Sequence, residues 1–150
     1  MANREYPERP LVGVGGVVIS GDCVLLVRRG APPLLGQWSI PGGLLESGET
    51  IFEGVRRELL EETRVDVRVL ELIEVFERIS LDAAGKAQYH YVVLDYLCQS
   101  IAGDARAGSD ASEVALVAER DLEHYSLSSA AQRVILKAFA MSKDRADKSA

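Results

Sequence analysis

The chain has few residues of the kinds that build covalent frameworks or imidazole metal sites. Its 150 residues include two cysteines and two histidines. Cys23 and Cys98 lie in apolar segments without C-x-x-C spacing, so we expect reduced, buried thiols. His90 and His124 have no partner at ligand spacing, which favours structural roles. Neither a disulfide scaffold nor a histidine metal centre is predicted.

The sequence also lacks long apolar runs, a secretory N-terminus and an excess of positive charge. No apolar run approaches the roughly 18 residues of a membrane span, and no basic stretch precedes an apolar core. We therefore expect a cytoplasmic protein with no membrane partner. The formal net charge of −6 argues against broad binding of nucleic-acid polymers. An anionic small molecule would have to be received by a metal ion or by local arginines.

Composition and pattern predict one α+β domain. With 47% hydrophobic and 27% charged residues, the chain is long enough to bury a sizeable core. We predict an N-terminal arm over 1–10, a domain over 11–141 and a flexible tail over 142–150. The pattern predicts strands at 11–20, 23–28, 67–79, 89–99 and 114–118, with 67–79 and 89–99 pairing as a hairpin, a mobile connection at 101–109 and a helix at 128–141.

A glycine loop leads into a strongly acidic helix. Thr50 followed by Glu53 forms a capping box, which predicts a helix from Ile51 to about Thr63. Within it, apolar residues at helical spacing define a buried stripe. The end of this helix carries several glutamates on adjoining faces, and their placement is the main functional signal in the sequence.

Two of these glutamates interrupt the apolar stripe. Glu62 lies one heptad after Val55 and projects from the middle of the stripe, while Glu58 borders it. Buried carboxylates without a positive partner are costly. Arg57 points elsewhere and more naturally pairs with Glu53 and Glu61. A hard divalent cation such as Mg²⁺ fits the two stripe carboxylates better, and the alternative is an acidic helix end that is merely solvated.

Residues 43–65 resemble the Nudix box, G-x5-E-x7-R-E-U-x-E-E-x-G-U, where U is aliphatic. The specified positions are filled by Gly43, Glu49, Arg57, Glu58, Leu59, Glu61, Glu62 and Val65. One position departs, because Arg64 replaces the final glycine. Glycine there would supply the left-handed residue that ends the helix, and a residue with a Cβ costs roughly 1 to 2 kcal/mol in that conformation.

The resemblance extends beyond the box to most of 11–141. Segments 24–29, 38–43, 90–98 and 110–113 resemble the corresponding parts of a bacterial branch described as ADP-ribose pyrophosphatase-like. It implies the Nudix fold, a mixed β-sheet packed between α-helices in an α/β/α sandwich. It also implies hydrolysis of a nucleoside diphosphate linked to another group, X.

The family resemblance assigns roles to the box residues. Mg²⁺, with Mn²⁺ as a possible substitute, would be held by carboxylates and a backbone carbonyl. The candidate metal ligands are Gly43, Glu58, Glu61 and Glu62. Glu49 and Arg57 would brace the box by an ion pair. A carboxylate must also orient or deprotonate the attacking water. The candidates are Glu58 and Glu61 in the box, and Glu113, then Asp110, in a later loop.

Outside the box, the substrate-contact predictions rest on weaker signals. Arg28 and Arg29 leave a strand beside the expected site and can grip phosphate, or they can simply be solvated. Phe76, Tyr91 and Tyr89 can supply a platform for a base, although aromatic residues in strands usually pack. For Trp38 we expect closure of the core rather than stacking on a base.

Three functions remain open from the sequence. The first is cleavage of ADP-ribose or a related sugar nucleotide. Its family group often has a proline about 15 residues after the box, where Ser80 and Leu81 stand here. The second is release of pyrophosphate from ordinary or oxidised nucleoside triphosphates. The third is a non-catalytic nucleotide sensor, which the intact glutamates argue against. A homodimer is left open as the oligomeric state.

Overall fold

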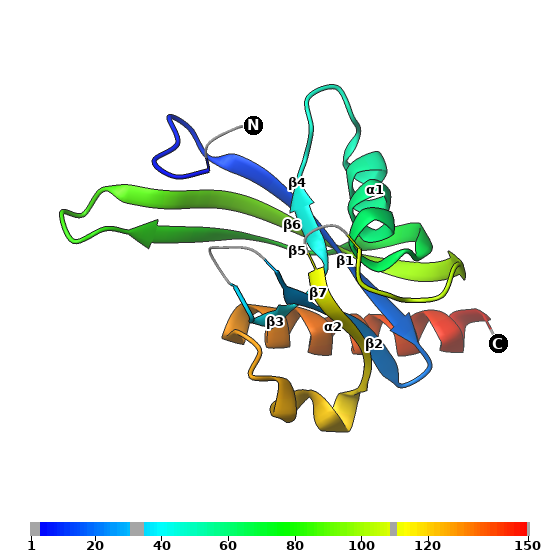
Figure 1. Cartoon of the computed structure of the whole chain (residues 1–150). Coiled ribbons are helices and arrows are strands. Elements are labelled where there is room, and N and C mark those ends of the chain that lie inside the picture. The colour runs from blue at the N-terminus through cyan, green and yellow to red at the C-terminus, as the bar shows by residue number, and fades with distance from the viewer. Residues whose placement is uncertain (1–3, 31–34, 109–110, 150) are drawn as a thin grey trace.

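A computed structural model describes residues 4–30, 35–108 and 111–149 (Figure 1). Within these ranges the elements, in chain order, are β1 (Leu11–Ser20), β2 (Cys23–Arg29), β3 (Trp38–Ser39), β4 (Gly42–Leu44), α1 (Ile51–Thr63), β5 (Asp66–Leu81), β6 (Ala87–Ala102), β7 (Ala111–Ala118), the 3₁₀ helix η1 (Glu119–Tyr125) and α2 (Ser129–Ser149). None of the helices in the described ranges is long and apolar enough to cross a membrane.

The strands form a mixed sheet in the order β3-β2-β1-β6-β5, with β4 added to β1 and β7 to β2. Strands β1 and β6 run parallel, whereas β5 and β6 form the expected antiparallel hairpin. Helices α1 and α2 cover opposite faces of the sheet (Figure 1). The predicted α/β/α sandwich is confirmed.

Side chains that alternate between the two faces of β1 let this strand pack against both helices. Successive side chains of a strand point to opposite faces. Val17 joins the core cluster beneath α2, and Val14 and Val18 join the cluster beneath α1. Glycine at position 16 brings the strand close to α1, because a Cβ there would lie 2.7 Å from a methyl carbon of Leu59. The box helix is therefore held tightly against the sheet.

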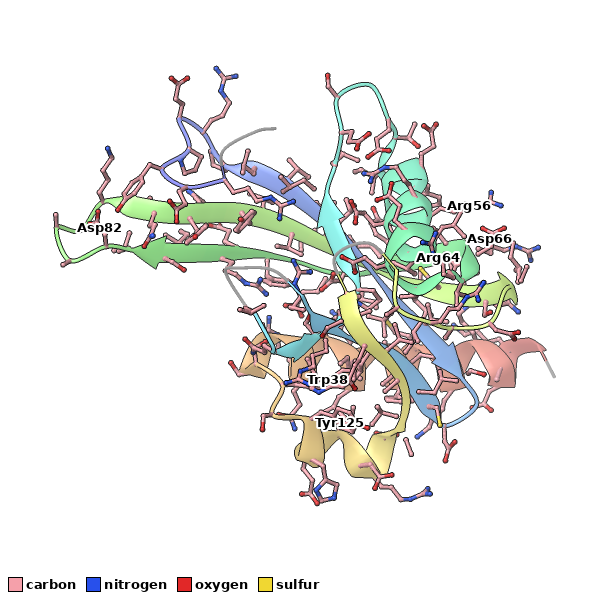
Figure 2. The ribbon with its side chains drawn as sticks, viewed as in Figure 1. Trp38, Arg56, Arg64, Asp66, Asp82 and Tyr125 are labelled. Atoms are coloured by element: carbon pink, nitrogen blue, oxygen red, sulfur yellow. The ribbon has the colours of Figure 1, made fainter. Side chains whose placement is uncertain are left out.

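The two ends of the chain differ from expectation in how much structure they carry. Helix α2 continues to Ser149, so the predicted flexible tail over 142–150 is helical throughout the part described. At the other end, residues of the arm bond to the β5–β6 hairpin. The Tyr6 amide donates to the Gln88 carbonyl at 2.8 Å and its hydroxyl to Asp82 at 3.0 Å. Asp82 lies at the hairpin tip in Figure 2.

The connection between β6 and β7 was expected to be mobile, yet its described part is bonded to the end of α1. The Arg106 amide donates to the Thr63 carbonyl at 2.9 Å, and the Gly108 amide donates to the Glu62 carbonyl at 2.8 Å. The last carbonyls of a helix have no partner inside the helix. This segment supplies that partner, and it thereby fixes the helix end that carries the acidic residues.

Candidate active site

Helix α1 begins and ends where the sequence predicts. The Glu53 amide donates to the Thr50 hydroxyl at 3.1 Å, which confirms the N-terminal cap. At the other end Arg64 adopts the left-handed conformation, with φ 63° and ψ 14°, and its amide donates to the Leu60 carbonyl. Arg64 thus ends the helix despite its Cβ. Figure 2 shows it beside the Arg56–Asp66 ion pair, whose shorter N···O distance is 2.7 Å.

Arg57 is the centre of the charged network in the box. Its guanidinium donates to Glu49 at 2.6 and 2.9 Å in a bidentate pair, as predicted. The same group donates to Glu58 at 2.8 Å and to Glu61 at 3.3 Å. It forms no ion pair with Glu53 in the part of the chain that the structure describes. The hydrogen bond from Arg57 holds the pKa of Glu49 below its usual range.

The Glu58 carboxyl group lies directly on the backbone of Gly43. A Cβ at residue 43 would fall 2.5 Å from the carboxyl carbon and from both carboxyl oxygens. Only 13% of the Glu58 side chain is exposed, and burial raises its pKa although the Arg57 hydrogen bond opposes the shift. Glycine at residue 43 is therefore required for this contact, and the box glycine and the box glutamate form one unit.

Glu62 is buried in the apolar face, as its place in the stripe predicts. Its residue exposure is 4%. One carboxylate oxygen accepts from the Gly42 amide at 3.1 Å, and the other lies 3.7 Å from a guanidinium nitrogen of Arg29. The Arg29 side chain is itself only 17% exposed, and its Nε is buried without a hydrogen-bond partner. Arg29 thus joins the box to the neighbouring cleft.

A cleft of about 120 Å³ opens beside the box on the α2 side of the sheet. Its wall includes Gly43 of the box, the preceding Gly42 and three of the predicted substrate contacts, Arg29, Phe76 and Tyr91. The Tyr91 hydroxyl is buried and has no hydrogen-bond partner among the described atoms. These predicted residues are therefore brought together in one place, next to the acidic helix.

Other predicted residues lie apart from this cleft. Arg28 donates to Glu113 at 3.0 Å across β2 and β7, and both side chains are about half exposed. The structure therefore pairs Glu113 with an arginine instead of placing it with the box glutamates. Trp38 packs against the core and meets Tyr125 edge to face at 5.1 Å, as expected for a core residue (Figure 2). Asp110 is outside the described residues.

Three charged residues of the cleft, Arg4, Arg78 and Asp95, were not predicted from the sequence. Asp95 on β6 is 3% exposed, and Arg78 lies on β5. Burial raises the pKa of Asp95 to about 7, and the nearby Arg78 charge opposes that shift. A lone acid inside the apolar run from Tyr91 to Cys98 was the available signal. It was overlooked because periodicity alone does not tell which strand face borders a cleft.

The donor set suits a hard divalent ion, although the side chains are not gathered into a closed cage. In the ranges described, no three Asp, Glu, His or Cys side chains lie close enough together to hold a metal. Mg²⁺ is usually bound by one or two carboxylates, completed by waters and substrate phosphates. Glu58 and Glu62 meet that requirement, because both carboxylates are largely shielded from solvent, contact the two cleft-wall glycines Gly43 and Gly42, and lie near arginines.

Comparison with known proteins points to a single family. The NUDIX domain family model matches residues 9–139. A curated ADP-ribose pyrophosphatase of Methanocaldococcus jannaschii is 35% identical over 104 residues, which are 69% of this chain and 59% of that protein. A MutT-like protein of Streptomyces ambofaciens is 36% identical, with 83% of this chain and 79% of the relative aligned. The nucleoside triphosphatase NudI of Escherichia coli is 31% identical, with coverages of 75% and 82%.

Solved structures show the same fold. The MutT NUDIX hydrolase of Burkholderia pseudomallei superposes with a TM-score of 0.76 at 27% identity, covering 87% of this chain and 98% of that one. The NUDIX domain of Shewanella oneidensis NrtR, solved with ADP ribose, gives a TM-score of 0.73 at 25% identity, with 89% of each chain covered. Nudix hydrolases generally use divalent metal ions. With a family model matching most of its length and a box that departs at one position only, this chain belongs to the Nudix hydrolase family.

Proposed function

We propose that this protein hydrolyses the pyrophosphate linkage of a nucleoside diphosphate joined to a further group, with ADP-ribose or a related sugar nucleotide as the substrate class. The observation that carries the proposal is the position of Glu58 and Glu62, whose carboxylates contact Gly43 and Gly42 in the wall of a cleft that Arg29 and Arg78 also line. Acidic ligands for a cation would then lie next to basic groups for phosphate oxygens.

Glu58, Glu62 and the Gly43 carbonyl would hold Mg²⁺, with Mn²⁺ as a substitute. A bound divalent ion offsets charge on phosphate oxygens and lowers the pKa of bound water. Arg29 would receive a phosphate oxygen through its unpaired Nε, which gains the acceptor that the folded chain does not give it. Arg57 would keep Glu49, Glu58 and Glu61 in fixed relative positions.

The attacking water needs a carboxylate that solvent can reach. Glu61 fits this role, because its side chain is 48% exposed while Arg57 restrains it. Glu113 stays the alternative, and its pairing with Arg28 would have to open first. Glu61→Gln and Glu113→Gln separate the two assignments, since the residue that orients the water should lower kcat more than it weakens binding.

A second candidate is release of pyrophosphate from nucleoside triphosphates. The similarity to NudI favours it, as does the lack of a proline near Ser80. Both candidates would use the same metal ligands and the same cleft, and they differ in the group joined to the nucleoside diphosphate, a sugar in the first and a phosphate in the second.

The test is a turnover panel with ADP-ribose, other sugar nucleotides, dinucleotides and ordinary and oxidised triphosphates, in Mg²⁺ and in Mn²⁺. Reaction in ¹⁸O-water should place the label in a phosphate product. Glu58→Gln and Glu62→Gln should each remove most turnover and leave the protein folded. Glu53→Gln, on the exposed face of the same helix, is the matched control and should retain activity.

Two outcomes would overturn the proposal. Wild-type kcat in both Glu58→Gln and Glu62→Gln would mean that the metal site is wrongly assigned. Tight nucleotide binding without turnover across the whole panel would favour a nucleotide sensor. Cytoplasmic location and a homodimer are not tested by these measurements and stay predictions.

A further inference from the structure

The buried carboxylate of Asp95 has no role in the metal chemistry described above. It lies on β6 in the wall of the cleft, 3% exposed, and it pairs in register with Gly15 of β1. A Cβ at residue 15 would fall 2.3 Å from one of its oxygens. Glycine in β1 is therefore what gives this carboxylate its room, and the site is built into the sheet.

Asp95 is unusual because its buried carboxyl group has no partner among the described residues. The described residues offer its carboxyl group neither a hydrogen bond nor an ion pair. The positive charge of Arg78 lowers the pKa of Asp95 without a direct contact. The facing residue of β5, Glu74, is also acidic and is bound by Arg133. An unpaired buried carboxylate is costly, so its position in a cleft wall points to a ligand that supplies the missing donors.

The neighbouring groups restrict what that ligand can be. Tyr91, Val93 and Asp95 alternate onto one face of β6 and all line the cleft. Tyr91 and Asp95 are separated by about 13 Å along the strand at the usual rise per residue. Between them Val93 faces Phe76 of β5 across the ladder. The surface is thus a polar group, an apolar strip and an acceptor, which suits a flat ring whose edge carries N–H donors.

We propose that Asp95 determines specificity by accepting hydrogen bonds from N–H or O–H donors of the substrate's nucleoside part. This inference rests on the proposed function, because it takes the cleft to be the nucleotide site. Donors from a bound ligand favour the ionised form of Asp95, which accepts at both oxygens and repels phosphate. Phosphates therefore go to the arginines and the neutral donor edge goes to Asp95. Substrates without the donor leave the carboxylate unpaired and are discriminated against.

The experiment measures binding by calorimetry, so that it does not depend on turnover. Two pairs of nucleoside diphosphates differ by one amine: guanosine against inosine, and adenosine against purine riboside. Each is also compared with its 2′-deoxy form. For wild type, loss of the contacted donor should weaken binding at least about tenfold, the size expected for a hydrogen bond to a charged acceptor.

The variants show whether Asp95 causes that difference. Asp95→Val removes both acceptors and should reduce the contrast within the contacted pair to below about threefold. Asp95→Asn keeps one acceptor and should give an intermediate difference in affinity within the pair. It replaces Asp95→Val in the test if the valine variant does not fold. Glu77→Gln is the matched control, because Glu77 is an exposed acid of the same hairpin outside the cleft wall, and it should leave the contrast unchanged.

The amine pairs and the 2′-deoxy pairs together identify which substrate group donates to Asp95. A contrast confined to an amine pair assigns Asp95 to the base, and one confined to the 2′-deoxy pairs assigns it to the ribose. Equal contrasts in wild type and Asp95→Val, or no contrast in any wild-type pair, would overturn the inference. Failure of the proposed function would look different, because it would be absence of turnover whatever the binding pattern.

Discussion

Gly43→Ala is the sharpest test of how the box is assembled, because the added methyl group meets the Glu58 carboxylate. The new Cβ would lie 2.5 Å from the carboxyl atoms, whereas ordinary contacts begin at 3.4 Å. The carboxylate must therefore move by 0.9 Å, the difference between these two distances. Gly43 is not among the glycines with positive φ, so alanine causes no backbone strain there.

The expected result is loss of activity with little loss of fold. Metal sites tolerate deviations of only about 0.2 Å in ligand distance, and a misplacement near 1 Å can cost about a hundredfold in rate. We expect kcat/KM to fall roughly ten- to a hundredfold, with a higher Mg²⁺ concentration for half-maximal rate. Stability should change less. Crowding costs about 1–3 kcal/mol, and the smaller unfolded-state entropy of alanine returns about 0.4–1 kcal/mol.

The assay is a Mg²⁺ titration of turnover with the best substrate of the panel, together with a thermal melt. Glu53→Gln is the control, since Glu53 is exposed on α1 and is not among the atoms that a Cβ at residue 43 would meet. It should keep the wild-type Mg²⁺ dependence. If Gly43→Ala keeps kcat/KM and Mg²⁺ dependence within threefold of wild type, the contact between Gly43 and Glu58 does not position a metal ligand.

Three further predictions follow from single residues. Arg64→Gly should raise the melting temperature by up to about 4 °C, since it relieves roughly 1 kcal/mol of left-handed strain less the added unfolded-state entropy; a lower melting temperature would mean that the Arg64 side chain makes a stabilising contact. Tyr91→Phe should leave the melting temperature of the free protein unchanged or higher, because the lost hydroxyl has no partner, yet weaken nucleotide binding two- to tenfold; calorimetry and a melt decide, and a destabilised protein with normal binding would contradict it. Asp95 has a pKa of about 7 when folded against an ordinary 3.8, so the folded state binds the extra proton, and this residue's contribution to stability should fall as pH rises from about 4 to 7 and level off above. Asp95→Asn should flatten that part of the denaturation profile, and an unchanged slope would refute the shift.

The sequence by itself determined the acidic helix and most of the elements around it. The capping residue, the apolar stripe and the heptad relation that buries Glu62 are local properties of the chain, so periodicity locates them. Strand β1 was predicted with its observed bounds, and the hairpin of β5 and β6 was predicted with ends short by a few residues. The ion pair of Glu49 with Arg57 followed from the family pattern rather than from spacing.

Only the tertiary structure decided which charged groups meet across elements. Helical spacing favoured Glu53 as a partner of Arg57, but the loop before α1 folds back and brings Glu49 to it instead. Adjacent arginines of β2 reach different acids, Arg28 meeting Glu113 and Arg29 meeting Glu62. The position of Asp95 in the cleft depends on parallel pairing of β6 with β1, a long-range contact that no local pattern encodes. Local periodicity fixes which residues are buried, and strand pairing fixes what they are buried against.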